Sequence, residues 1–273
     1  MKPLREAFAL VLRTPRLWAI QFVGNVVILL LYAAWLRLPE AHWWDLLLNV
    51  VVLLLAILGA LVLHGGTLNY FHSAHADRAA LLMPNFKTAL KHSLAIALWA
   101  LVFFFLCFQA DKLGDYAYTF PGYLRSELPS WLRKHTTANG VTSVYDFVVG
   151  FILWIILPGL LLPAALLAAN QGFRGLVRVR EWRRVLGRVS YWVVLMLAVI
   201  PAGIVIMLLL EWKMNPATAT LRGEEISLVL RLLVCYLIAL FAWLWVCSMV
   251  GRAYQEINRV GTIEEQGSVR QGV

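Results

Sequence analysis

The sequence predicts an all-α, polytopic membrane protein in which six transmembrane helices form three hairpins, with amphipathic helices lying at the membrane interface. Of the 273 residues, 61% are hydrophobic and 14% are charged, whereas soluble domains average about 45–50% and 25%. A soluble fold of this length could not bury so much apolar surface. The apolar residues form continuous runs rather than short alternating segments, which is typical of membrane helices and not of a transmembrane barrel.

Six apolar runs contain no Asp, Glu, Lys, Arg or His and approach the length of about 20 residues that a membrane helix needs. They cover residues 17–36, 46–63, 93–110, 147–169, 189–210 and 232–251. The second and third runs are short, so we expect these two helices to extend beyond them. The runs predict one transmembrane domain over residues 1–256, followed by a polar cytoplasmic tail over 257–273.

The distribution of Lys and Arg between the connecting segments predicts the orientation. The segments on the side of the two termini hold 16 of these basic residues, and the segments on the other side hold eight. Because basic segments stay in the cytoplasm, we expect both termini to be cytoplasmic. The net charge of +9 is then explained by helix ends that contact anionic lipid, and no nucleic-acid partner is expected.

A basic amphipathic stretch precedes each odd-numbered run, over residues 4–13, 86–92 and 173–188. The last stretch is the most basic. If it is one helix, four arginines share a face and point to the headgroups of anionic phospholipid; they are Arg174, Arg178, Arg184 and Arg188. The pattern of amphipathic helix, span, turn, span and small-residue exit occurs three times, which indicates a weak internal repeat.

The longest connection, residues 111–146, carries apolar residues at helical spacing between Tyr123 and Leu132. We expect a short interfacial helix here, bounded by Pro121 and interrupted at Pro129, because proline removes a helical hydrogen bond.

Three motifs carry a resemblance to known proteins: the opening Leu4-Arg5-Glu6-Ala7-Phe8, the related Phe86-Lys87-Thr88-Ala89-Leu90-Lys91, and the ending Gly251-Arg252-Ala253-Tyr254-Gln255-Glu256. Together with the glycine-rich span exits, they resemble poorly characterised six-span bacterial membrane proteins. These include the membrane domain that is fused to some glycerophosphodiester phosphodiesterases. The resemblance implies a bacterial inner-membrane location, but it transfers no catalytic residue, because the soluble phosphodiesterase domain is not in this chain.

Histidines cluster after the second run. His72 and His75 are three residues apart, so on a continuous helix they share a face and could bind one metal ion. His64 lies two turns away, and a third ligand would have to come from Asp77 or His92. The simpler interpretation is a group of ordinary interfacial histidines, and the metal site is the alternative.

Polar residues are rare inside the runs. Gln21 and Asn25 lie one turn apart in the first run, and Asn49 lies in the second. Such amides usually form hydrogen bonds between helices, and a polar cavity lined by the three is the alternative. Prolines interrupt the fourth and fifth runs (Pro158, Pro163 and Pro201). We expect kinks that serve packing, with a broken-helix transport site as the alternative.

The sequence shows no catalytic constellation that would indicate an enzyme. It also has no ionisable residue inside a run, of the kind that ion-coupled transport usually requires. The first hypothesis is therefore a non-enzymatic scaffold or accessory subunit of a larger envelope assembly, with other membrane subunits or further copies of itself as partners. The second is a protein that binds or transports lipid or another amphiphile, and the third is a metal-dependent enzyme that uses the His72 and His75 cluster. No cofactor is indicated.

Overall fold

The computed structural model describes residues 2–39, 42–77, 80–117, 119–212 and 221–271, and all regular secondary structure in these ranges is helical. Six helices are long and apolar enough to cross a membrane, and each coincides with one of the predicted runs. They are α2 (Pro15–Trp35), α3 (Trp43–Ala76), α5 (Ser93–Asp115), the continuous stretch of α8 (Ala138–Phe151), η1 (Ile152–Ile156) and α9 (Leu157–Gln171), then α12 (Val189–Glu211) and α13 (Leu221–Gln271). The protein is therefore an integral membrane protein with six candidate spans.

Short helices precede each odd-numbered span, as the amphipathic pattern predicts. They are α1 (Lys2–Leu12), α4 (Leu82–Lys91), α10 (Phe173–Leu176) and α11 (Val179–Leu186). The long connection contains α6 (Phe120–Glu127) and α7 (Ser130–His135). The break between α6 and α7 falls at Leu128 and Pro129, which confirms the predicted interruption.

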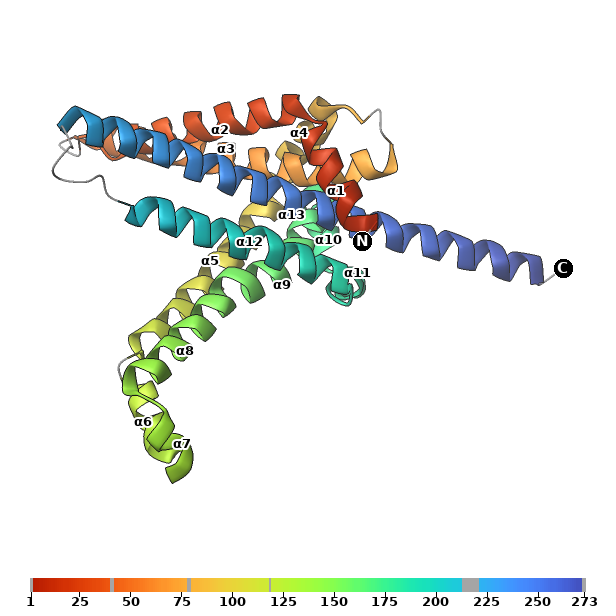
Figure 1. Ribbon diagram of the computed structural model, residues 1–273. Helices are drawn as coiled ribbons and strands as arrows, with labels where there is room; N and C mark the ends of the chain where they lie inside the picture. Colours follow the sequence, from red (N-terminus) through yellow and green to blue (C-terminus); the bar gives the residue numbers. More distant parts are fainter. Residues whose placement is uncertain (1, 40–41, 78–79, 118, 213–220, 272–273) are drawn as a thin grey trace.

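The spans meet at one end of the molecule and separate toward the other (Figure 1). We call the end that carries α1, α4, α10 and α11 the junction end. The α2–α3 and α12–α13 hairpins run away from it in the same general direction, whereas α5 and α8 diverge from these four helices. The principal partners of α8 are α5, α6 and η1, which belong to its own hairpin.

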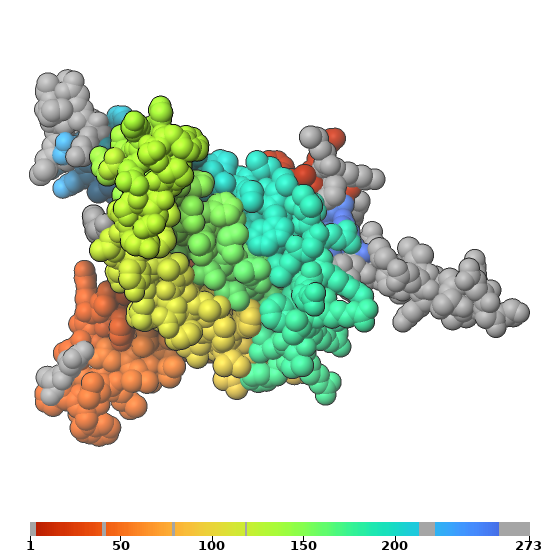
Figure 2. All heavy atoms as spheres, turned by 90° about the horizontal axis from the view of Figure 1, so that it is seen from below, coloured from red at the N-terminus to blue at the C-terminus, as the bar shows by residue number. Residues whose placement is uncertain are grey.

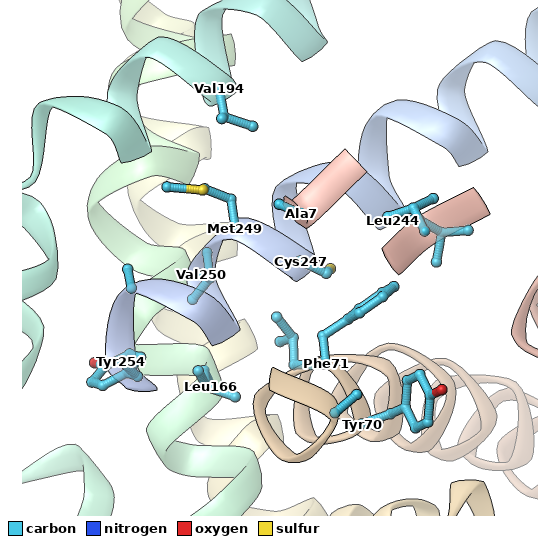
Figure 3. Packing of buried hydrophobic residues seen from close by; sticks show 14 of the residues in the cluster. Ala7, Tyr70, Phe71, Leu166, Val194, Leu244, Cys247, Met249, Val250 and Tyr254 are labelled. Carbon is cyan, nitrogen blue, oxygen red and sulfur yellow. The ribbon is translucent and has the colours of Figure 1, made fainter. Parts of the chain in front are cut away.

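The hydrophobic core lies at the junction end and is centred on α13. Half of the most apolar window of α13 is buried, compared with 11% of the corresponding window in α2. Figure 3 shows Phe71 of α3 lying against the stretch of α13 that carries Cys247, Met249 and Val250, with Leu166 of α9 close by. One apolar cluster therefore joins the three hairpins.

A glycine allows α3 and α13 to approach closely. A Cβ atom on Gly251 would lie 2.7 Å from the backbone nitrogen of His72 and 2.8 Å from the carbonyl carbon of Phe71. Both atoms belong to the backbone of α3, so they cannot rotate away. The small residue at the exit of the last span is thus a requirement of helix packing.

The prolines of the fourth span cause local changes that neighbouring side chains compensate. Pro163 has no backbone N–H, so the carbonyl of Gly159 loses its helical partner. The Tyr191 hydroxyl donates to that carbonyl at 2.7 Å, and the Tyr254 hydroxyl donates to the carbonyl of Pro163 at 3.1 Å. A π-helical turn, η1, ends at Ile156, two residues before Pro158. Neighbouring tyrosines therefore satisfy backbone carbonyls at these interruptions, while Pro201 lies inside a continuous α12.

The expectation of a single helix over residues 173–188 is wrong. The chain forms α10, breaks at Val177 and Arg178, and then forms α11. Gly175 holds α10 against α9 so tightly that a Cβ atom there would lie 2.2 Å from the Leu167 carbonyl oxygen. After the break, α11 buries the Val185 side chain in the core. The four predicted arginines consequently do not share one helix face.

Candidate functional site

A cavity of about 490 Å³ opens at the junction end between α1, α3 and α13. Its wall contains both charged and apolar side chains, namely Glu6, Ala9, Leu10, Arg13, Thr14, Tyr70, Ala74, His75, Ala76, Arg252, Gln255 and Glu256. Because α1 directly precedes the first span, the cavity lies beside the point where the chain enters α2 at Pro15.

A chain of ion pairs includes three residues that line this cavity, Glu6, Arg252 and Glu256. Arg252 pairs with Glu6 of α1 and, at 3.0 Å, with Glu256 one turn further along α13. Glu256 also pairs with Arg188 at 3.1 Å, where α11 leads into α12. The Arg252 side chain is 13% exposed, so its charge depends on these carboxylates for solvation. The network therefore ties α1 and the start of α12 to α13.

The two histidines of the predicted metal site lie on the continuous helix α3 but use their rings for different contacts. His75 Nε2 donates to the backbone carbonyl of Ser248 at 2.8 Å, because a carbonyl can only accept. The Ser248 hydroxyl in turn donates to the carbonyl of Ala7 at 3.1 Å. His75 thus supports the contact between α1, α3 and α13.

His72 faces a different neighbour. Asn170 Nδ2 donates to His72 Nδ1 at 3.2 Å, and Gln255 Nε2 donates to the His72 carbonyl at 3.0 Å. Asp77 ends α3, and His92 Nδ1 donates to the carbonyl of Ala169 at 3.0 Å. Among the described residues, no three His, Cys, Asp or Glu side chains are arranged to hold a metal ion. The geometry does not favour the metal hypothesis.

The amides of the first span join α2 to α3. The Gln21 amide is fully buried and donates to the Thr67 hydroxyl and, at 3.3 Å, to the Leu63 carbonyl. Asn25 Nδ2 donates to Gln21 within α2, at 2.8 Å to its backbone oxygen. Asn49 lies apart from this pair and donates to the Pro39 carbonyl at 3.3 Å. The structure therefore does not bring the three amides into one cavity.

Replacing Gln21 with leucine is expected to lower the free energy of unfolding by about 1 kcal/mol, the typical contribution of a hydrogen bond between membrane helices. Thermal unfolding in detergent measures this loss. Asn25→Leu is the matched control, because it removes only hydrogen bonds within α2. Equal stability of the Gln21→Leu protein and the wild type would contradict the proposed role of Gln21 in joining the two helices.

A second hollow, of about 670 Å³, lies on α11 and is lined by Val179, Arg180, Arg183 and Arg184. The spacing of the three arginines places them on one helix face, and all three side chains are exposed. None of them makes an ion pair or a side-chain hydrogen bond with a described residue. The opposite face buries Val185 and half-buries Trp182. The segment that carries α10 and α11 lies on the outside of the molecule (Figure 2, blue-green).

The predicted headgroup arginines take different positions. Arg184 lies in the α11 hollow, and Arg174 is exposed on α10. Arg178 pairs with Glu181 at 3.0 Å, and Arg188 pairs with Glu256. Arg180 and Arg183 were not predicted, although a helix beginning at Val179 would have placed them beside Arg184.

Comparison of the chain with known protein families, curated proteins and solved structures finds no match. The six spans expected from the resemblance to six-span bacterial proteins are present, whereas membership of such a family stays a prediction. The proposals below rest on the geometry of this chain.

Proposed function

We propose that this protein binds anionic phospholipid at the surface of the membrane that it crosses, with α11 as the headgroup-binding element. The observation that carries the proposal is the group formed by Arg180, Arg183 and Arg184, which is exposed and has no carboxylate partner among the described residues. An amphipathic helix with an arginine-rich face lies in the headgroup plane and attracts anionic lipid. The basic character of the same segments predicts that this surface is cytoplasmic.

The position of α11 supports binding to a headgroup rather than to a soluble anion. Val185 is fully buried, and the Trp182 ring meets Trp99 of α5 in an edge-to-face contact with 5.8 Å between ring centroids. These contacts hold the polar face of α11 at the end of the spans, where phosphate groups lie. Guanidinium groups can bind phosphate oxygens through two parallel hydrogen bonds.

Replacing Arg180, Arg183 and Arg184 together with glutamine is expected to weaken phosphatidylglycerol binding by up to about 100-fold, because each charge near an anionic surface contributes about 1 kcal/mol. Native mass spectrometry of the full chain, titrated with phosphatidylglycerol in detergent, measures the change. The matched control is Arg5→Gln/Lys87→Gln/Lys91→Gln, which removes three exposed positive charges from the junction end outside α11. An equal loss in both variants would show that only total charge matters and would contradict a site on α11.

A second candidate function is a scaffold or accessory subunit, and it is favoured by the divergence of α5 and α8 from the other spans (Figure 1). This hairpin presents apolar side chains along its length, including Phe104, Phe105 and Phe147, which are 57–69% exposed. A photoreactive residue at Phe105, introduced in the native membrane, tests this function. A stoichiometric protein crosslink would support a subunit role, whereas crosslinks to lipid alone would contradict it.

A further inference from the structure

The cavity between α1, α3 and α13 differs in charge from the α11 hollow. Two carboxylates, Glu6 and Glu256, and two guanidinium groups, Arg13 and Arg252, contribute to its wall. The signs balance, so the cavity offers little net attraction to a simple anion. Its volume of about 490 Å³ lies in the range that proteins use to enclose small ligands.

Two of these groups keep hydrogen-bonding capacity that no described residue uses. Glu6 Oε2 accepts a hydrogen bond from the Arg252 guanidinium. The other carboxylate oxygen, Oε1, has no partner among the described residues. The Glu6 side chain is 50% exposed, which leaves this second oxygen accessible. The Arg13 guanidinium is exposed and makes no ion pair or side-chain hydrogen bond with a described residue. An acceptor and a cation that have no partner among the described residues therefore line the same cavity.

The position of the cavity relates these groups to the membrane. Arg13 and Thr14 end the segment before α2, which begins at Pro15. Because α2 is a candidate span, its first turn lies at the level of the lipid headgroups. Phe8 and Leu12 of α1 are 38% and 58% exposed, so they can rest against acyl chains.

We propose that this cavity binds a zwitterionic phospholipid headgroup that carries a primary ammonium, such as phosphatidylethanolamine. The ammonium donates to the free carboxylate oxygen of Glu6, and the phosphodiester binds the guanidinium of Arg13. Tyr70 also lines the cavity, and a tyrosine hydroxyl can donate to phosphate oxygens. A balanced pair of charges matches a zwitterion better than an anion, because both ligand charges then find a partner of opposite sign. This site shares no residue with α11, so either proposal can fail without the other.

Native mass spectrometry of the full chain with phosphatidylethanolamine and phosphatidylcholine of identical acyl chains tests the proposal. The two lipids share the phosphodiester, but the methylated choline group has no N–H donor. We expect about tenfold tighter binding of phosphatidylethanolamine, because one charge-assisted hydrogen bond is lost with phosphatidylcholine. Equal binding of the two lipids by the wild-type protein would overturn the proposal.

Two variants assign the effect to the cavity. Arg13→Gln should weaken binding of both lipids, and it leaves the described ion pairs intact because Arg13 takes part in none. Glu6→Gln should abolish the preference for phosphatidylethanolamine. The control Arg5→Gln changes an exposed charge on the same helix outside the cavity and should bind both lipids as the wild type does. A preference for phosphatidylethanolamine that survives in Glu6→Gln, or unchanged binding of both lipids by Arg13→Gln, would overturn the assignment.

Soluble phosphoethanolamine distinguishes a lipid from a free zwitterion. If the ligand is lipid, millimolar phosphoethanolamine should not displace phosphatidylethanolamine, because acyl-chain contacts add to the affinity of the lipid. Displacement at low micromolar concentration would assign the cavity to the free compound and overturn the lipid assignment.

Discussion

Replacing Gly251 with alanine is expected to lower the free energy of unfolding by about 3 kcal/mol, at the upper end of the usual cost of overpacking. The added Cβ atom would meet the backbone of α3 at 2.7 Å from His72 N. Since no side chain can rotate away, α3 and α13 must separate. Their separation would disturb the core around Phe71, Cys247 and Val250 (Figure 3). Thermal unfolding in detergent measures the loss.

Gly203→Ala is the matched control for this prediction. Gly203 also lies in a membrane helix, but apart from its chain neighbours and the nearby backbone of its own helix, no heavy atom lies within 4 Å of the position of its missing Cβ. Alanine there should be neutral or stabilising by up to about 1 kcal/mol, because glycine is a poor helix former. Similar stability changes in the two variants would contradict the close approach of α3 and α13 at Gly251.

Replacing Arg252 with methionine is expected to destabilise the protein by about 2 kcal/mol, because Glu6 and Glu256 then lose a charge-assisted partner. The loss is local, since Arg188 still pairs with Glu256. The attachment of α1 should weaken most, so hydrogen exchange in α1 should rise more than exchange in α9. Unfolding in detergent and hydrogen-exchange mass spectrometry measure the two effects.

Arg178→Met is the control, because the Arg178–Glu181 pair is largely exposed, with 53% and 31% of the two side chains accessible. Its loss should cost less than about 0.5 kcal/mol. The double variant Arg252→Met/Glu6→Met should lose less free energy of unfolding than the sum of the losses in the two single variants. The reason is that the Glu6 carboxylate, which Arg252→Met alone leaves without its partner, is absent from the double variant. Strictly additive effects would show that Arg252 does not hold α1 through Glu6.

The successful predictions depend on short-range properties of the chain. The apolar runs identify the six spans because lipid requires about 20 consecutive apolar residues. Amphipathic periodicity locates α1, α4 and the segment before α12, and Pro129 locates the break between α6 and α7. The break between α10 and α11 at Val177 and Arg178 is not encoded in that periodicity, so the predicted arginine face was wrong.

The candidate sites were only partly visible in the sequence. Arg184 was predicted to lie at a headgroup surface, and the structure adds Arg180 and Arg183 beside it. Glu6 and Arg13 were not predicted as site residues, because they become neighbours of α3 and α13 only through folding. Similarly, a spacing of three residues suggests that His72 and His75 act together, yet His75 bonds to Ser248 of α13, whereas His72 Nδ1 accepts a hydrogen bond from Asn170 of α9.

The sequence by itself determined the six apolar segments that are long enough to cross a membrane, the approximate positions of the amphipathic segments, and where the basic residues lie. These properties follow from composition and periodicity along a single segment. Only the tertiary structure decided which charged side chains form ion pairs within the protein and which remain available to a ligand. Arg188 and Arg13 illustrate the difference, because both are basic residues next to a span. Arg188 pairs with Glu256 of α13, 68 residues further along the chain. Arg13 lines the cavity and has no carboxylate partner among the described residues. That outcome depends on how helices distant in sequence pack together, which no local pattern specifies.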